Sequence, residues 1–556
     1  MLTNKVNAGL VAGCFNHAGW ENVVVSPGSR NAALIKAFQE YPKIRLHSIV
    51  DERSASFFAL GLAKALNEPV GLICTSGTAV LNYSSAMAEA YYQGVPLVVM
   101  SADRPVGMIN TGEGQTIDQQ NVFQNFQKGF LNLPEEILDI NSVTSDILNL
   151  LNNSSEGKPG PIHFNLHFSE PLYDNTGLEL NINYVSLGQN SILKKEELIP
   201  SDFLSDWKLS NKKIILCGIL PHNKVINKYL NALSKVNNVV VLYESTSNLN
   251  IDSGVANIDR CLSQIDEVIL NESLVLTIGE HIISKKIKNA LRSANNLKHW
   301  HHSIGGIDQD TFGMLISTLK GSIEGLLEQL TSIDSINERN FTGLWKDAVL
   351  TTRELHNSFL SKVEYSDFSV FYEILKTIPS SYHLQSANSS VVRYIQLFDF
   401  NQWQTCHANR GTSGIDGSTS TAIGFANGMK EPIVLITGDI SFLYDSNGLW
   451  NNSVPKDFRI IVINNGGGGI FRIIPGPSTV DNYETLFETN HSIDIQPICE
   501  AFGFEFVRTD NLNDLKGALN VFYSPSSSPK LLEVITPREV NADVLKEYFS
   551  FLNKAN

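Results

Sequence analysis

Short apolar runs alternate with longer amphipathic stretches through the first part of the chain. Four of these runs have the length and composition of buried strands: Asn22–Val25, Arg45–Val50, Val70–Thr75 and Pro96–Ser101. Between them, Glu52–Leu66 and Ala79–Tyr92 carry small and apolar residues at helical spacing. Because strands that alternate with helices pair in parallel, this pattern predicts a parallel sheet with helices on both faces.

The pattern returns near the end of the chain as an internal repeat. ALGLAKALNEPVGLI (Ala59–Ile73) and AIGFANGMKEPIVLI (Ala422–Ile436) match without a gap, with seven of fifteen positions identical, at an offset of 363 residues. The same offset places SPGSR (Ser26–Arg30) opposite SSVVR (Ser389–Arg393). Matches that stay in register over this distance indicate a duplicated domain.

A third α/β unit is predicted between the two copies, because Lys212–Gly218, Asn238–Tyr243 and Leu274–Ile278 also have strand character. Polar residues interrupt the pattern near Tyr184–Pro200 and Ser332–Gly343. We therefore expect an α/β protein with three doubly wound parallel-sheet domains, of which the first and third are homologous. The predicted domains are residues 1–184 (N-terminal), 195–335 (central) and 345–556 (C-terminal).

Composition and charge narrow the class of protein. The chain is 42% hydrophobic and 18% charged, its apolar runs are too short to span a membrane, and its start does not resemble a signal peptide. Six cysteines are scattered without a C-x-x-C pair, which indicates neither a disulfide framework nor a zinc site. These features favour a cytoplasmic protein, and the net charge of −15 argues against nucleic acid as a partner.

Polar residues follow two predicted strands of the second copy, Ile433–Thr437 and Ile460–Ile463. Asp439 comes just after the first strand, and Asn464–Gly467 follows the second. The carboxyl ends of parallel strands meet at one edge of a sheet, where ligands bind. A carboxylate, the Asn465 amide and a glycine carbonyl suit a hard octahedral cation, although the same letters also fit two ordinary loops.

Nine segments, in order and with matching spacing, resemble the menaquinone-pathway synthase family that forms 2-succinyl-5-enolpyruvyl-6-hydroxy-3-cyclohexene-1-carboxylate. They are SPGSR (Ser26–Arg30), DERSA (Asp51–Ala55), TSGTA (Thr75–Ala79), ADRP (Ala102–Pro105), GQTIDQ (Gly114–Gln119), NSSVVR (Asn388–Arg393), NRGTSGIDG (Asn409–Gly417), GDIS (Gly438–Ser441) and NNGGGGIF (Asn464–Phe471). The resemblance covers nearly the whole chain and is weakest in the middle.

The resemblance implies the thiamine diphosphate-binding fold and a magnesium (or manganese) ion on the cofactor diphosphate. Its metal ligands would be Asp439, Asn465 and Gly467, and its cofactor loop would add Gly438, Ile440 and Ser441. Glu52 would be the catalytic residue that bonds the aminopyrimidine ring, and Ile415 would support the bent cofactor. A first-turn acidic residue such as Glu52 also has a simpler explanation, because it stabilises a helix N-terminus.

The implied reaction is that of a transferase. Decarboxylation of 2-oxoglutarate leaves a succinyl carbanion, which adds in a 1,4 fashion to isochorismate. Both substrates are dicarboxylates, and arginine grips carboxylates with a planar fork. The family positions that face substrate are occupied here by Ser29, Arg30, Arg104, Gln115, Ser389, Arg393 and Arg410, with Lys285 and Lys286 replacing a Lys-Arg pair. The two lysines are equally compatible with a solvated basic patch.

Three alternatives remain at this point. The chain could be an acetolactate synthase-like carboligase acting on pyruvate, or a non-catalytic paralogue that binds the cofactor. A dinucleotide-dependent dehydrogenase is disfavoured, since no G-x-G-x-x-G opens a helix after a strand.

Relatives join two such domains across an interface between copies, so a homodimer or homotetramer is expected. The cluster His299–His302 is interpreted as structural, because neighbours on a strand face opposite sides.

Overall fold

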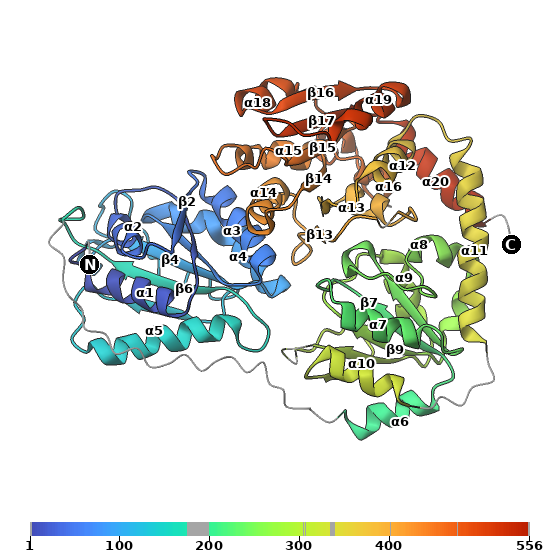
Figure 1. Cartoon of the computed structure of the whole chain (residues 1–556), viewed down its shortest axis with the longest axis horizontal. Helices are drawn as coiled ribbons and strands as arrows, with labels where there is room; N and C mark the ends of the chain where they lie inside the picture. The colour runs from blue at the N-terminus through green and yellow to red at the C-terminus, as the bar shows by residue number, and fades with distance from the viewer. Residues whose placement is uncertain are drawn as a thin grey trace.

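The described part of the chain forms three α/β domains (Figure 1). The structure, a computed structural model, describes residues 3–174, 199–303, 305, 307–333, 340–400, 402–474 and 476–553. The polar stretches predicted to separate the domains, near Tyr184–Pro200 and Ser332–Gly343, lie largely outside these ranges. The exact domain limits therefore stay a prediction, whereas the predicted fold class is confirmed by three sheets in which every strand pair is parallel.

The first domain holds a six-stranded sheet in the order β2-β1-β3-β4-β6-β5. Its elements are α1 (Val6–His17), β1 (Asn22–Val25), α2 (Ala32–Gln39), β2 (Arg45–Ser48), α3 (Glu52–Leu66), β3 (Val70–Cys74), the 3-10 helix η1 (Gly77–Tyr83), α4 (Ser84–Gln93), β4 (Leu97–Asp103), β5 (Phe130–Leu133), α5 (Ile140–Ser155) and β6 (Ile162–His167).

The predicted strands Val70–Thr75 and Pro96–Ser101 are found as β3 and β4 with bounds shifted by one or two residues, and two other predicted elements differ for a physical reason. The strand predicted to reach Val50 stops at Ser48, because its neighbour β1 ends at Val25, the pairing partner of Ser48. The predicted helix Ala79–Tyr92 begins as η1 and becomes α-helical only at Ser84. The Gly77 amide, at the start of η1, donates to the Gln119 side chain (2.8 Å), a contact with no local pattern in the sequence.

The third domain repeats this architecture, which confirms the duplication. Its strand order β13-β12-β14-β15-β17-β16 corresponds strand for strand to that of the first sheet. Its main elements are α12 (Asp367–Thr377), β12 (His383–Ser386), α13 (Ser390–Ile395), β13 (Cys406–Ala408), α14 (Ser418–Met429), β14 (Ile433–Gly438), α15 (Asp439–Tyr444), β15 (Arg459–Asn464), α16 (Ile470–Ile473), α17 (Tyr483–Leu486), α18 (Gln496–Ala501), β16 (Glu505–Thr509), α19 (Leu512–Phe522), β17 (Lys530–Ile535) and α20 (Val540–Asn553).

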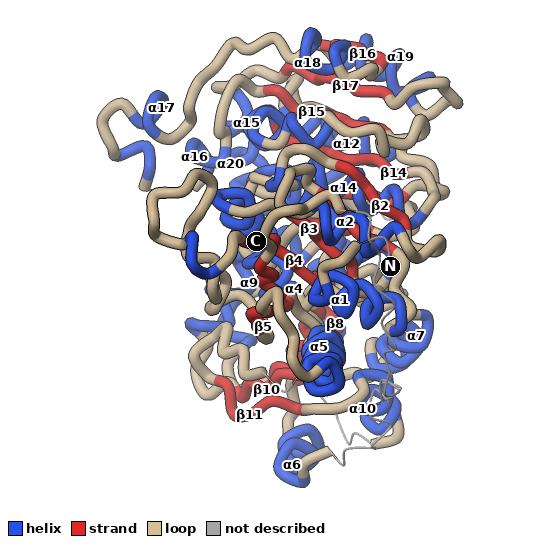
Figure 2. The backbone as a smooth tube through the Cα atoms, turned by 90° about the vertical axis from the view of Figure 1, so that its left-hand side faces the viewer, coloured by secondary structure: helices blue, strands red, loops and turns tan. Residues whose placement is uncertain are grey.

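The middle domain carries a five-stranded sheet in the order β11-β10-β9-β7-β8. Figure 2 shows β10 and β11 at the end of the molecule opposite to β16 and β17. Helix α11 (Phe341–Leu360) leads from this domain into the third (Figure 1). The remaining elements are α6 (Ser201–Leu209), β7 (Lys213–Cys217), α7 (Lys224–Leu233), β8 (Val239–Tyr243), α8 (Ile258–Cys261), β9 (Leu274–Ile278), α9 (Lys285–Ser293), β10 (Lys298–His302), β11 (Leu315–Leu319) and α10 (Ile323–Thr331).

The histidine cluster lies on β10 inside this sheet. His299 and His301 both hydrogen-bond to the Thr277 hydroxyl on β9 (2.9 Å each), and burial lowers the pKa of each imidazole to about 4. His302 lies 3.0 Å from the Gly321 carbonyl. These are contacts of neutral core histidines.

No helix in the described part of the chain is long and apolar enough to cross a membrane.

The first and third domains share one apolar core, centred on the crossing of α3 and α14 (Figure 1). Glycines allow these helices to approach closely. A Cβ on Gly61 would lie 1.9 Å from the Thr421 carbonyl oxygen, and one on Gly424 would lie 2.0 Å from the Phe58 carbonyl oxygen. Gly61 and Gly424 are separated by the repeat offset of 363 residues, so the two copies contact each other through equivalent positions.

Gly61→Ala is expected to destabilise the joint between these domains. The new methyl group meets backbone rather than a flexible side chain, so the helices must separate at a cost of about 1–3 kcal/mol. Gly517→Ala in α19 is the matched control: nothing lies within 4 Å of that Cβ, and the change should stabilise the helix by up to about 1 kcal/mol. Thermal unfolding of both variants checks this, and an unfolding temperature of Gly61→Ala at or above that of the unaltered chain would contradict it.

Candidate active site

The predicted metal ligands come together at the carboxyl edge of the third sheet. Gly438 ends β14 and Asp439 begins α15, while Asn465 and Gly467 follow β15, the neighbouring strand. The amide of Gly467 donates to Asp439 Oδ2 (2.9 Å), and that of Ile440 to Asp439 Oδ1 (2.7 Å). Gly467 has a φ of +156°, and a Cβ there would lie 2.8 Å from the Glu488 carbonyl oxygen, so only glycine fits.

These residues fit a hard cation with oxygen ligands. Asn465 is buried, and its Oδ1 has no hydrogen-bond partner among the described residues, whereas its Nδ2 donates to Asp367 (3.1 Å). A buried acceptor without a partner is costly unless a ligand completes it. The predicted set combines one carboxylate, one amide and one carbonyl, and such oxygens are the ligands that Mg²⁺ and Mn²⁺ accept.

Two supporting residues of this edge were not predicted. Asp367, on α12, accepts from Asn465 Nδ2 and from the Thr536 hydroxyl (2.6 Å), so it turns the amide oxygen of Asn465 outward. His491 Nε2 lies 3.2 Å from Asp439 Oδ2, and this contact raises the pKa of His491. Outer partners of this kind orient metal ligands. No motif in the sequence marks them, since Asp367 lies 98 residues before Asn465.

The loop before α14 is tied to the same edge. The Ser441 hydroxyl donates to the Ile415 carbonyl (3.0 Å), which joins two of the predicted cofactor-binding residues. Ile415 is only partly buried, as expected for an apolar side chain that contacts a bound molecule. Ile440 and Ser441 lie in the first turn of α15, next to Asp439.

Glu52 is the first residue of α3 and lines a cavity of about 390 Å³ in the first domain. The rest of its wall comes from residues 75–79 and 115–117, which include Gln115. Burial, with a smaller effect from Asp51, raises the pKa of the Glu52 carboxyl. A carboxyl group with a raised pKa at a cavity wall is a candidate for proton transfer, whereas a purely capping acid would have an unshifted or lowered pKa.

Arg30 and Arg104 form a pair of cations beside this cavity. Burial lowers the pKa of Arg30, and the nearby Arg104 lowers it further. Arg104 donates to the carbonyl of Gly114 (3.1 Å), next to Gln115. Arg30 is also held by the Phe168 carbonyl (3.0 Å) and by an ion pair with the exposed Glu170 (3.1 Å). The Nε of each guanidinium is buried without a partner among the described residues, which leaves donors for an anionic ligand.

Ser29 lies beside this pair, and its hydroxyl accepts from that of Tyr173 (3.1 Å). Gln115 has a φ of +56°, and Ser389, in the third domain, has a φ of +68°. Residues other than glycine rarely adopt this left-handed backbone conformation, and such outliers concentrate at ligand sites. The two predicted polar positions are therefore strained in the way that binding sites often are.

Arg393 and Arg410 form a second cationic pair where the third domain meets the middle domain. Burial lowers the pKa of both, and Arg393 lowers that of Arg410 further. Arg410 donates to Asn388 Oδ1 (2.9 Å), and its Nε has no partner among the described residues. Glu244, at the end of β8, lies near Arg410, and burial raises its own pKa to about 7. Arg393 and Arg410 therefore repel each other, and Arg410 keeps an unused Nε donor among the described residues.

The two predicted lysines occupy different surroundings. Both are exposed at the start of α9, but only the Lys286 ammonium lies over an aromatic ring, 3.1 Å from the ring centre of Phe549. Lys288, which was not predicted, lies near Glu244 and Arg410 and donates to the Ile282 carbonyl (3.0 Å). The structure brings Lys288, rather than Lys285, next to Arg410.

Within one chain the candidate site is in two halves. Glu52, Arg30, Arg104 and Gln115 belong to the first domain, and every residue that lines the Glu52 cavity does too. The metal edge and the second arginine pair belong to the third domain. Over the ranges that the structure describes, no hydrogen bond or ion pair joins Glu52 to Asp439.

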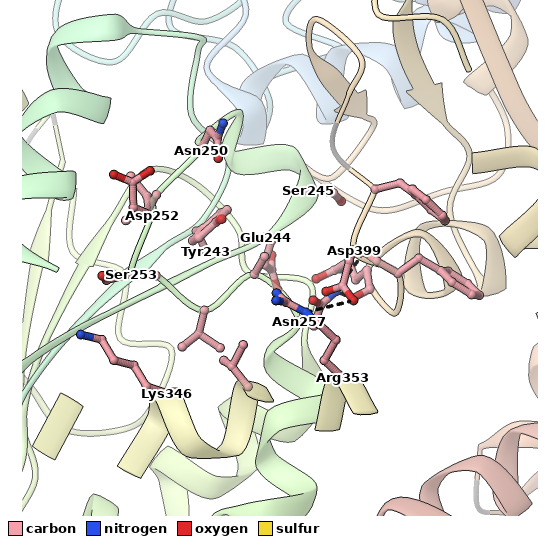
Figure 3. Close-up of a pocket in the computed structure, with 18 of the residues that line it drawn as sticks. Tyr243, Glu244, Ser245, Asn250, Asp252, Ser253, Asn257, Lys346, Arg353 and Asp399 are labelled. Carbon is pink, nitrogen blue, oxygen red and sulfur yellow. Dashed lines mark hydrogen bonds and ion pairs between the residues drawn. The ribbon is translucent and has the colours of Figure 1, made fainter. Parts of the chain in front are cut away.

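A larger cavity, of about 560 Å³, lies between the middle domain, α11 and the third domain (Figure 3). It contains none of the predicted residues, and its charged side chains nearly balance: Lys346 and Arg353 against Glu244, Asp252 and Asp399. Arg353 and Asp399 lie 3.7 Å apart across it. Its lining shows no preference for an anion and does not compete with the arginine pairs as a dicarboxylate site.

Comparison with known proteins agrees with this arrangement. Residues 7–122 match the family described as thiamine pyrophosphate enzyme, N-terminal TPP binding domain, and residues 387–534 match the corresponding C-terminal TPP binding domain. The two duplicated domains are therefore the two cofactor-binding domains of a thiamine diphosphate-dependent enzyme.

Similar curated proteins define the particular family. The chain is 39% identical to 2-succinyl-5-enolpyruvyl-6-hydroxy-3-cyclohexene-1-carboxylate synthase of Christiangramia forsetii and 40% identical to that of Flavobacterium johnsoniae, over 96% of both chains in each case. It is 36% identical to the synthase of Porphyromonas gingivalis over 99% of this chain and 98% of that one. The chain belongs to this synthase family.

Proposed function

We propose that the chain decarboxylates 2-oxoglutarate and adds the remaining succinyl unit to isochorismate. The products are 2-succinyl-5-enolpyruvyl-6-hydroxy-3-cyclohexene-1-carboxylate and carbon dioxide, in menaquinone biosynthesis. Thiamine diphosphate, when bound, supplies the chemistry that stabilises the carbanion. The observation that carries the proposal is the presence of two arginine pairs in a chain of net charge −15, in which Arg30, Arg104 and Arg410 each keep a buried Nε donor with no partner among the described residues. Such pairs suit two dicarboxylates.

The site residues have distinct roles in this proposal. Asp439 and Asn465, with the carbonyl of Gly467, would hold Mg²⁺ or Mn²⁺, and Ile440 and Ser441 would contact the diphosphate. Support comes from the orphaned Asn465 oxygen and from the close backbone approach at Gly467. Glu52 would exchange a proton with the cofactor ring, and Ile415 would support that ring. The arginines, Ser29, Gln115 and Ser389, with Lys285 and Lys286, would orient the two substrates.

The proposal includes at least a homodimer, with a homotetramer as the larger possibility. Glu52 and Asp439 must both reach one cofactor, yet in a single chain the Glu52 cavity has walls from the first domain only. The two residues that flank Glu52 do contact the third domain of the same chain, but not at Asp439. Arg53 donates to the Tyr444 carbonyl (2.7 Å), and Asp51 accepts from Asn447 (2.7 Å). A second copy would supply the missing metal edge.

A cytoplasmic location completes the proposal, in keeping with six free, buried cysteines.

The decisive assay combines the protein with thiamine diphosphate, Mg²⁺, 2-oxoglutarate and isochorismate. Mass spectrometry should detect a product equal to the two substrates minus carbon dioxide, with one carbon dioxide released per product. Replacing 2-oxoglutarate by pyruvate tests the acetolactate synthase-like alternative. Pyruvate lacks one carboxylate, and losing a charge-assisted contact of about 3 kcal/mol should lower kcat/KM about 100-fold. Equal use of pyruvate would favour the alternative, and no turnover with either acid would favour a non-catalytic paralogue.

A further inference from the structure

A carboxylate of the first domain is buried against the segment of the third domain that carries Arg410. Glu89, on α4, is 1% exposed. Its Oε1 accepts from the amide of Gly411 (2.7 Å), and its Oε2 accepts from the amide (2.6 Å) and the hydroxyl (2.7 Å) of Thr412. Three donors from another domain thus converge on one buried carboxylate, immediately after Arg410.

The chain on the other side of Arg410 is also fixed by the first domain. The carbonyl of Ala408 accepts from Lys64 Nζ and from Gln93 Nε2, each at 3.3 Å. Gly411 lies so close to α4 that a Cβ there would be 2.6 Å from the Glu89 carbonyl oxygen. The first domain therefore holds the backbone two residues before Arg410 and one residue after it.

Burying this carboxylate is not needed to join the two domains. The α3–α14 crossing already provides a continuous apolar contact, and a buried charge costs free energy unless it is fully hydrogen-bonded. Glu89 instead fixes the orientation of the backbone, because its carboxylate binds two consecutive amides. The neighbouring Arg393 repels Arg410, so the Arg410 segment would relax away from its position without an anchor.

We propose that Glu89 is a positioning residue for Arg410. It fixes the backbone at Gly411 and Thr412 so that the Arg410 guanidinium, held at Asn388, presents its free Nε donor to a substrate carboxylate. The inference rests on the proposed function, which makes Arg410 a substrate-binding residue. It assigns to the first domain a second task besides Glu52, namely shaping the substrate site of the third domain in the same chain.

Glu89→Gln tests this in the full-length enzyme. Glutamine keeps the shape, but its NH₂ group must face one of the amide N–H groups that the carboxylate now accepts. The expected result is a 10- to 100-fold higher KM for one of the two substrates. Both kcat and the Kd of thiamine diphosphate with Mg²⁺ should change less than about 3-fold, because the metal edge is untouched. Glu89→Asp, which keeps both acceptors, should recover part of the loss.

Glu68→Gln is the matched control, since Glu68 is exposed just after α3 and the substitution removes the same charge. It should leave every constant unchanged. Arg410→Ala should raise the KM of the same substrate as Glu89→Gln, and the double variant should be no worse than Arg410→Ala alone. Multiplied effects in the double variant would overturn the inference, as would weakened cofactor binding with an unchanged KM.

The test separates failure of the inference from failure of the proposed function. If Arg410→Ala raises a KM and Glu89→Gln does not, the positioning role is wrong while the proposed function stands. If the unaltered enzyme forms no product from 2-oxoglutarate and isochorismate, the proposed function fails first, and the positioning role fails with it.

Discussion

Glu52→Gln should produce a folded enzyme that binds thiamine diphosphate and Mg²⁺ but turns over about 10³-fold more slowly. Glutamine has nearly the same shape, so α3 keeps its first turn and the cavity keeps its volume. The substitution removes only the ability to exchange a proton. Glu52 is partly buried at the cavity wall, and burial raises the pKa of its carboxyl. Carbon dioxide release from 2-oxoglutarate measures turnover, and quenching of tryptophan fluorescence on titration measures cofactor affinity.

Asp51→Asn is the control for this prediction. Asp51 is the N-cap of the same helix and accepts from the Ser54 amide (2.9 Å), and asparagine caps a helix equally well. The control removes a neighbouring charge while leaving Glu52 in place, so its turnover should stay within about 3-fold of the unaltered enzyme. Turnover of Glu52→Gln equal to that of the unaltered enzyme would contradict the catalytic assignment, and weaker cofactor binding would indicate a structural role for Glu52.

The periodicity of the sequence predicts the central strands of the first and third sheets, because these strands are buried: β1, β3 and β4 in the first sheet, and β14 and β15 in the third. The strands β5, β6, β12, β13, β16 and β17 were not predicted. β1 and β3 lie inside the sheet and read as unbroken apolar runs, and the helix Glu52–Leu66 is found with its predicted bounds. Edge strands are harder to predict. β11 is partly exposed and combines polar with apolar residues, so its sequence (LISTL) does not differ from that of a loop.

Candidate residues for binding the cofactor and substrates could be proposed from the sequence because they stand in short motifs, many of them at strand ends. The residues that hold these side chains in position could not be predicted. Glu89 lies 322 residues before Gly411, and in the sequence it is one acidic residue on an ordinary helix. A hydrogen bond between segments that are remote in the sequence leaves no local sequence pattern. In the sequence, a buried carboxylate cannot be distinguished from one on the surface. The same holds for Asp367 and Lys288, whose neighbours become visible only in the folded chain.

Asp439→Asn is expected to weaken the binding of thiamine diphosphate in the presence of Mg²⁺ by more than about 100-fold. Changes in the outer partners of metal ligands alone typically cost 10- to 100-fold in affinity, and here the proposed charged ligand itself is lost. The new NH₂ group would face the Gly467 amide or the Ile440 amide, both of which donate to the carboxylate at present. Equilibrium titration of the cofactor at several Mg²⁺ concentrations measures the effect, and dialysis against a chelator should reduce binding to the unaltered enzyme to the level of the variant.

Asp445→Asn separates loss of the metal from general damage to the third domain. Asp445 is also fully buried, and burial raises its pKa to about 7. It accepts from the amide and the hydroxyl of Ser420 (2.7 Å each), which an asparagine can match with its oxygen and its NH₂ group. Its cofactor affinity should stay within about 3-fold. Equal losses in the two variants would mean that any change to a buried aspartate disturbs this domain, and the metal assignment of Asp439 would be wrong.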